Sequence, residues 1–242
     1  MNDNWRDCDA WRKQHLPMNT TSNEAAKLFD ISLSQLYGYY DNKQYDGLVA
    51  SLNGMINADP DFILGYCLKA GIELLGSNVL LNTNHDAVLQ QKASQLNSSL
   101  TQRELDHVKA INSLQQGNLI DAVQTWEDIL IENPTDMLAI KFAHSSYFYL
   151  GFGNQMRDSI ARVLPLWNKN LSYYNYLYGM YAFGLAESNQ IDQARKMAMT
   201  GLDLCRSDAW AAHAVCHCNE YTGQYENGVK FLLETEKDWQ VN

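Results

Sequence analysis

Small and large apolar residues recur at fixed positions around short polar turns, and the clearest such unit covers residues 103–136. Gly117 and Asn118 form the expected turn between two helical segments of this unit. Ala122 and Trp126 follow on one face of the second segment. Pro134 closes that segment. A small residue lets two helices approach, and a large apolar residue fills the groove between them. The pattern therefore predicts a helical hairpin.

The same pattern returns along the chain, with hairpins expected to start near residues 29, 63, 103, 137, 175 and 209. Within each pair of these starts the spacing is 34 residues, the length of a tetratricopeptide repeat. The residues that repeat the turn, small and large positions are Asn189, Gly223, Ala182, Ala194, Gly228, Leu52, Leu185 and Leu232. We therefore predict an all-α, tetratricopeptide-type α-solenoid of about six helical hairpins in a right-handed superhelix. It forms one domain over residues 1–242, in which residues 1–28 are a lead-in segment and helix start.

Local capping signals agree with this helical reading. Residues 21–24 and 101–104 each place a threonine three positions before a glutamate, which is the spacing of a capping box. Asp136 and Asp208 precede helical segments and are expected to be N-caps. No alternating pattern of useful length predicts a β-strand.

The net charge of the chain argues against two classes of partner, nucleic acids and anionic membranes. The chain carries 18 basic and 28 acidic residues, a net charge of -10, and it has no dense basic run. Nucleic-acid binding depends on Lys and Arg neutralising phosphates, and anionic membranes attract the same residues. We therefore expect neither nucleic-acid binding nor membrane insertion, and no apolar run reaches the roughly 18 residues of a membrane span.

The N-terminal residues and the cysteines indicate the compartment. The first residues have neither the basic segment nor the apolar segment of a secretory signal peptide. Five scattered cysteines are an odd number and indicate reduced thiols. The expected localisation is cytoplasmic.

Several long segments resemble one family. They are LPMNTTSNEAAKLFD (16–30) with the preceding Asp9-Ala-Trp11, NPTDMLAIKFAH (133–144), YFYLG (147–151), QMRDSIAR (155–162), and Asp208-Ala-Trp210 with His213, His217 and Glu220. Together they cover essentially the whole chain, in order. In these segments the chain resembles the tetratricopeptide repeat protein 38 family.

The resemblance implies an all-helical, cytosolic repeat protein and assigns it no biochemical activity. Family members continue past the position that matches Trp239, so the resemblance also implies that this chain is an N-terminal portion or a shortened relative. A solenoid that stops there leaves an apolar helix face uncapped. We expect a further segment, a protein partner or self-association through this C-terminal end to cover the face.

The sharpest candidate for chemistry is the set His213, His217 and Glu220. Their spacing places them on one face of a helix, where two imidazoles one turn apart and a carboxylate can bind zinc or another divalent metal. The pattern lacks the glutamate that follows the first histidine in metalloprotease helices. His144 lies in the first helix of an earlier hairpin, and first helices line the concave surface of such solenoids. The alternative is that these histidines only shape a groove or bind polar groups of a partner.

Three further sets are weaker candidates. Thr21, Ser22 and Asn23 begin a helix and can bind an anion through free backbone amides, or can be caps and nothing more. Tyr147 and Tyr181 belong to a tyrosine-rich stretch that can recognise a peptide or a small apolar ligand, although packing between helices explains much of it. Arg157 can anchor a carboxylate, or can lie on a solvated helix face.

These observations leave two functions open. The first is a non-catalytic scaffold whose concave groove binds a peptide, a partner protein or a small ligand, with no cofactor. The second is a metal-dependent or acid–base enzyme that uses the cluster of His213, His217 and Glu220 in the groove.

Overall fold

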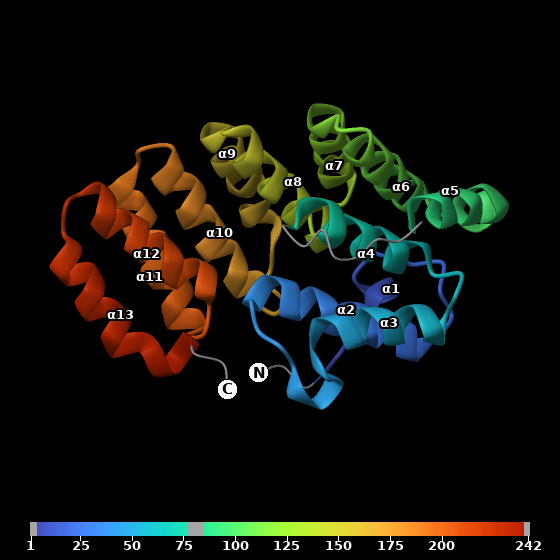
Figure 1. Ribbon diagram of the computed structural model, residues 1–242, viewed down its shortest axis with the longest axis horizontal. Helices are drawn as coiled ribbons and strands as arrows, with labels where there is room; N and C mark the ends of the chain where they lie inside the picture. The colour runs from blue at the N-terminus through green and yellow to red at the C-terminus, as the bar shows by residue number, and fades with distance from the viewer. Residues whose placement is uncertain (1–3, 77–84, 240–242) are drawn as a thin grey trace. The chain divides into compact units, whose positions relative to one another are not determined.

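The computed structural model describes residues 4–76 and 85–239, and over these ranges the chain is all α-helical (Figure 1). These ranges contain thirteen α-helices, three short 3-10 helices and no β-strand, so the all-α part of the predicted fold class is confirmed. The α-helices are α1 (Cys8–Lys13), α2 (Asn23–Gly38), α3 (Gly47–Ala58), α4 (Ile63–Leu75), α5 (His85–Leu96), α6 (Gln102–Gln115), α7 (Leu119–Glu132), α8 (Met137–Leu150), α9 (Gly153–Val163), α10 (Tyr174–Glu187), α11 (Ile191–Leu204), α12 (Ala209–Tyr221) and α13 (Tyr225–Trp239). Within the described ranges, no helix has the length and apolar composition that crossing a lipid bilayer requires.

Five of the six expected hairpin starts coincide with helix starts to within one residue. Helices α4, α8 and α12 begin at residues 63, 137 and 209, and α6 and α10 begin one residue before 103 and 175. Helix α2 begins earlier than position 29, at Asn23, because Ser22 caps it there: the Ser22 Oγ accepts a hydrogen bond from the Ala25 N–H at 3.2 Å. The arrangement is consistent with a helical repeat. The continuous superhelix stays a prediction.

Four successive hairpins turn in the same way. Each first helix (α6, α8, α10 and α12) is followed by a residue with a left-handed backbone: Gly117, Gly151, Asn189 and Gly223, with φ of 77°, 70°, 60° and 67°. The N–H of the next residue then donates to a carbonyl five positions back, in the pairs Asn118–Ser113, Phe152–Tyr147, Gln190–Leu185 and Gln224–Asn219, at 2.8 or 2.9 Å. These are Schellman caps, which satisfy carbonyls that the helix end leaves open. The turn positions expected at 117, 189 and 223 are therefore confirmed.

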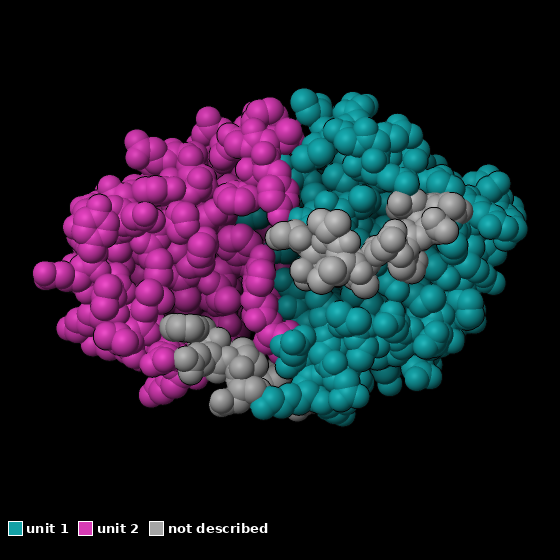
Figure 2. Space-filling view, viewed as in Figure 1, with its two compact units in different colours: residues 1–36, 41–146 teal, residues 37–40, 147–242 magenta. Residues whose placement is uncertain are grey.

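The chain divides into two compact units (Figure 2). Unit 1 consists of residues 1–36 and 41–146, and unit 2 of residues 37–40 and 147–242.

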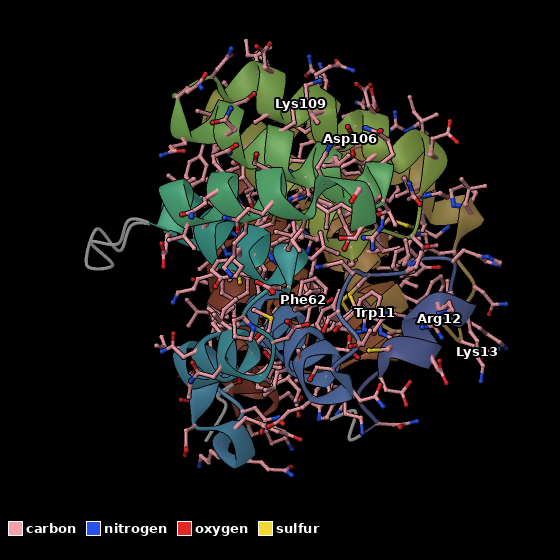
Figure 3. The ribbon with its side chains drawn as sticks, turned by 90° about the vertical axis from the view of Figure 1, so that its right-hand side faces the viewer. Trp11, Arg12, Lys13, Phe62, Asp106 and Lys109 are labelled. Atoms are coloured by element: carbon pink, nitrogen blue, oxygen red, sulfur yellow. The ribbon has the colours of Figure 1, made fainter. Side chains whose placement is uncertain are left out.

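Unit 1 has an aromatic core. Trp11 of α1 packs against Phe29 with ring centroids 5.5 Å apart, and Phe29 packs against Phe62 at 5.4 Å. Figure 3 labels Trp11 and Phe62, the two outer residues of these three. Helices α4 and α8 approach closely, because a Cβ added at Gly71 would lie 2.3 Å from the Phe142 ring. Phe142 in turn packs against the fully buried Trp126. The large position predicted at residue 126 is therefore a core position.

A buried polar network also joins α6 to the start of α8. The Asp136 carboxylate accepts hydrogen bonds from the Ala139 N–H at 3.0 Å and from Arg103 Nη1 at 2.7 Å, and it lies 3.0 Å from His107 Nε2. Burial alone raises the pKa of Asp136, but His107 and Arg103 outweigh that effect and hold it well below its ordinary range. Asp136 is thus the N-cap that the sequence predicts, and it is also the anion of a buried network that the sequence pattern does not reveal.

Unit 2 packs α10 between its neighbours through glycines. A Cβ at Gly179 would lie 2.7 Å from the Ala211 backbone nitrogen of α12, and a Cβ at Gly184 would lie 2.7 Å from the Arg157 Cα of α9. Asp208 caps α12 by accepting from the Trp210 and Ala211 N–H groups, as expected. Ala182, Ala194 and Leu185 occupy buried positions as predicted. This close packing sets α10 and α12 side by side and positions the candidate site.

Candidate functional site

One face of α12 carries a row of four aromatic rings. Trp210, His213, His217 and Tyr221 follow one another at intervals of one turn, and their ring centroids are 5.5, 4.4 and 5.5 Å apart along the row. Residues three and four apart lie on the same side of a helix, so the row follows from the sequence spacing. We refer to these four residues, with Phe183 of α10 behind them, as the aromatic–histidine face.

Phe183 is the support of this face. Its side chain is buried, and its ring centroid lies 4.9 Å from Trp210 and 5.3 Å from each of the two histidines. The close approach of α10 and α12 at Gly179 makes these contacts available. Phe183 therefore packs against the buried side of the row, while the four residues of the row remain accessible to solvent to different degrees.

A polar group closes one end of the row. The Tyr221 hydroxyl donates to Glu187 Oε1 at 2.6 Å, and His217 Nδ1 lies 3.3 Å from both of these oxygens. Burial, followed by the Glu187 carboxylate, raises the pKa of Tyr221 to about 12. The phenol is therefore protonated at neutral pH and donates to Glu187, which fixes both side chains.

Glu187, rather than Glu220, is the carboxylate next to His217. Glu187 ends α10 and Tyr221 ends α12, and the two are 34 residues apart, at equivalent positions of successive hairpins. Aligning the first helices of the hairpins would have paired these positions, but the helical spacing within α12 alone singles out Glu220. In the described residues, no hydrogen bond or ion pair joins the exposed Glu220 to either histidine.

His213 lies in the middle of the row in a weakly polar environment. Although its side chain is exposed, the surrounding aromatic rings desolvate it, and this desolvation lowers its pKa. The neighbouring His217 lowers the pKa further, and Glu187 acts in the opposite direction. His213 is therefore a neutral imidazole at pH 7.

Metal binding at the predicted trio stays a prediction. Across residues 4–76 and 85–239, no three His, Cys, Asp or Glu side chains are placed to hold one metal ion. Two imidazoles one turn apart remain, and a structural zinc site needs four ligands. Cys216 and Cys218 flank His217 in sequence, and both are free thiols.

An open pocket lies at the other end of the row. Tyr39, Ala209, Trp210 and His213 line it, and its volume is about 360 Å³. The Tyr39 ring, which is 58% exposed, meets Trp210 edge-on with centroids 5.5 Å apart. Tyr39 comes from the residues after α2, so no local pattern around α12 could have identified it.

The remaining predicted groove residues do not join this face. His144 is buried in unit 1. Tyr147 and Tyr181 pack half-buried against the apolar core of unit 2. Arg157 Nε donates to Asp158 at 2.6 Å, and this bond raises the pKa of Arg157. These four side chains take part in packing or local pairing.

The predicted anion site at the start of α2 is engaged in internal bonds. The Ser22 Oγ caps Ala25, and Asn23 Oδ1 accepts from the Cys8 N–H at 3.2 Å. The hydroxyl that caps the helix is therefore that of Ser22, whereas the expected capping box used Thr21. The second expected box is confirmed, since Thr101 and Glu104 exchange both capping bonds.

Helix α13 presents a second uncovered apolar surface. Tyr225, Val229 and Leu233 are 66%, 59% and 69% exposed, and with Glu226, Lys230 and Glu234 they line an open pocket of about 450 Å³. Leu232, at the position expected to be large and packed, is 37% exposed.

No protein-family model matches the chain, and no solved structure matches it. The resemblance to the tetratricopeptide repeat protein 38 family therefore stays a prediction.

Proposed function

We propose that this chain is a cytoplasmic, tetratricopeptide-type scaffold of the tetratricopeptide repeat protein 38 family, and that it binds a peptide segment of a partner protein. Its ligand surface is the aromatic–histidine face. The observation that carries the proposal is the row of four rings on α12, backed by Phe183 and fixed at one end by Glu187. Contiguous exposed aromatic surface is typical of protein interaction sites.

Packing alone does not account for the outer rings. Phe183 supplies the buried contact between α10 and α12, whereas Tyr221, Phe148 and Tyr149 are 49%, 49% and 57% exposed. An exposed aromatic ring adds little to the stability of the folded chain, because burial supplies most of its stabilising effect. These rings extend the surface from Phe183, since Phe148 lies 5.6 Å from it and Tyr149 lies 5.7 Å from Phe148.

The second candidate is the acid–base or metal-dependent enzyme, and the contact of His217 with Glu187 favours it. A carboxylate beside one ring nitrogen orients an imidazole and leaves the other nitrogen as a base or a metal ligand. Zinc titration separates the candidates. A stoichiometric zinc ion that is lost in His217→Ala and kept in Glu220→Gln would favour the enzyme with a new ligand set.

The scaffold proposal is tested by selecting ligands from a phage-displayed library of random peptides. We expect enriched peptides to bind the wild-type chain and to lose roughly tenfold or more in affinity with Tyr221→Ala or Phe148→Ala, as interface aromatics do. Tyr225→Ala is the matched control, because Tyr225 is an exposed tyrosine on α13. Failure to enrich any peptide, or peptides indifferent to both substitutions, would contradict the proposal.

Self-association through α13 is the remaining partner proposal. Glu226, Lys230 and Glu234 alternate in sign beside the exposed apolar side chains of this helix. A second copy lying antiparallel, shifted by one turn from the register that sets lysine opposite lysine, can place each Lys230 opposite a glutamate of the other copy while both copies bury Val229 and Leu233.

A further inference from the structure

The pocket at the Trp210 end of the aromatic–histidine face has walls of an unusual kind. Three of its four lining residues are aromatic, and their rings stand nearly perpendicular to one another: 76° between Tyr39 and Trp210, and 85° between Trp210 and His213. Successive centroids are 5.5 Å apart in both pairs. Two rings set nearly at right angles form a corner, and a group in that corner can contact part of the face of each ring.

The backbone at Tyr39 determines where its ring lies. Tyr39 has φ of 52°, in the left-handed region that disfavours a bulky side chain and suits glycine. A Cβ at the preceding Gly38 would lie 2.5 Å from the Tyr40 ring, so that ring would have to move. Tyr39 directly follows the end of α2, where a left-handed residue commonly closes a helix. This conformation fixes the direction in which the Tyr39 ring leaves the helix end.

Burial does not explain why a tyrosine occupies this position. Tyr39 is 58% exposed, although desolvation of its hydroxyl by partial burial, and secondly Tyr149, raise its pKa to about 12. By contrast, Tyr173 also has a left-handed backbone but is buried against Tyr37. Tyr173 therefore has a packing role, whereas the exposed ring of Tyr39 forms a wall of the pocket.

The electrostatics of the pocket suit a positive ligand. Its lining residues include no lysine or arginine, and the chain carries a net charge of -10. The lowered pKa of His213 leaves its ring uncharged at pH 7, so the ring does not repel a cation. The Glu187 carboxylate also acts on His213 and adds negative potential.

We propose that the pocket lined by Tyr39, Trp210 and His213 binds the trimethylammonium group of a trimethylated lysine side chain. Aromatic rings attract such cations through their negative faces, and a methylated ammonium is easily desolvated. This inference rests on the proposed peptide-binding function, since a peptide that carries the modified lysine can continue along α12 from Trp210 towards Tyr221. Choline has the same head group without a peptide, and it is the competing source of this chemistry.

The test compares four probes by calorimetry or by the NMR signals of Trp210: Nα-acetyl-trimethyllysine amide, Nα-acetyl-lysine amide, choline and 3,3-dimethylbutanol. The alcohol has the shape of choline without its charge. We expect trimethyllysine amide to bind more tightly than both lysine amide and choline, and 3,3-dimethylbutanol to bind about tenfold more weakly than choline. Equal binding of choline and the alcohol would overturn the cation site. Choline binding as tightly as trimethyllysine amide, or more tightly, would overturn the peptide source.

Tyr39→Gly separates a binding role from a structural one. The substitution removes one wall of the pocket and also relieves the left-handed strain, so we expect trimethyllysine affinity to fall at least about tenfold while the melting temperature holds or rises. Tyr225→Ala, outside the pocket, should leave the affinity unchanged. Wild-type affinity in Tyr39→Gly would overturn the inference. If library peptides bind the face and trimethyllysine amide does not, only this inference fails and the proposed function stands.

Discussion

His217 Nδ1 lies 3.3 Å from Glu187 Oε1, and the Tyr221 hydroxyl donates to the same oxygen at 2.6 Å. One carboxylate at the end of α10 therefore fixes two side chains of α12. This contact connects successive hairpins at the point where the aromatic–histidine face ends. The aromatic–histidine face and the packing of α10 against α12 thus share this polar anchor.

Replacing Glu187 with glutamine is expected to lower the pKa of Tyr221 towards the ordinary value of about 10. The carboxylate raises this pKa in the wild-type chain, second only to burial. Titration of the tyrosine ring signals by carbon-13 NMR measures the change. Glu220→Gln is the matched control and should have a smaller effect, because Glu220 acts on Tyr221 less than Glu187 does. Equal shifts in the two variants would contradict the assigned anchor.

The same substitution should lower the pKa of His213 further below its ordinary value. Glu187 opposes the two effects that lower this pKa, namely desolvation and the neighbouring His217. A proton-NMR titration of the histidine signals between pH 4 and 8 provides the measurement. A rise in the His213 pKa would show that Glu187 does not act on the row.

Asp136→Asn should destabilise unit 1 by about 3 kcal/mol, because it leaves Arg103 buried without its anion. The pH dependence has a definite sign. The folded-state pKa of Asp136 lies below its unfolded value of about 3.9, so its contribution is present above that pH and is lost as the pH falls below it. Urea unfolding at several acidic pH values should show that the free energy of unfolding falls less steeply with decreasing pH in the variant than in the wild-type chain. Asp128→Asn, at an exposed aspartate, is the control, and an equal loss of stability in both variants would contradict the network.

Asn189→Gly should stabilise the chain by up to about 1 kcal/mol, because glycine adopts the left-handed backbone of this turn without strain. The opposite change, Gly117→Ala, should destabilise it by about 1 kcal/mol. Open space surrounds Gly117, so the added methyl group meets no neighbour and the effect is that of the backbone alone. Thermal unfolding of the two variants measures both changes in stability, the expected gain in Asn189→Gly and the expected loss in Gly117→Ala. A loss of stability in Asn189→Gly would show that the asparagine side chain has a further role.

Leu233→Lys should abolish self-association. The substitution places a charge in the exposed apolar surface of α13, where Leu233 is 69% exposed in the isolated chain. Multi-angle light scattering over a range of concentrations is expected to show a rising mass for the wild-type chain and a monomer for the variant. A wild-type chain that stays monomeric at every concentration would remove this proposal.

The sequence predicted the features that are determined by residues close together in the chain. Helical spacing and turn residues placed five helix starts to within one residue, and Gly117, Asn189 and Gly223 all have the left-handed backbone of a helix-ending turn. Sequence spacing also found the row of His213 and His217, because the residues of one helix face are fixed by its period.

Contacts between distant segments were not predictable in this way. Glu187 meets His217 because α10 and α12 pack closely, and Tyr39 reaches Trp210 from the end of α2. The buried pairing of Asp136 with His107 likewise depends on how α6 and α8 meet. A single sequence contains the residues of these contacts but not the distances that make them partners.

Hydrogen–deuterium exchange of the wild-type chain, with and without a peptide selected from the library, tests whether the aromatic–histidine face binds the peptide. We expect the peptide to slow exchange in residues 209–221 of α12 and at the C-terminal end of α10, and Tyr221→Ala to remove this protection. Protection confined to other segments, such as α3 or α7, or no protection at a saturating peptide concentration, would contradict the claim that the aromatic–histidine face is the ligand surface.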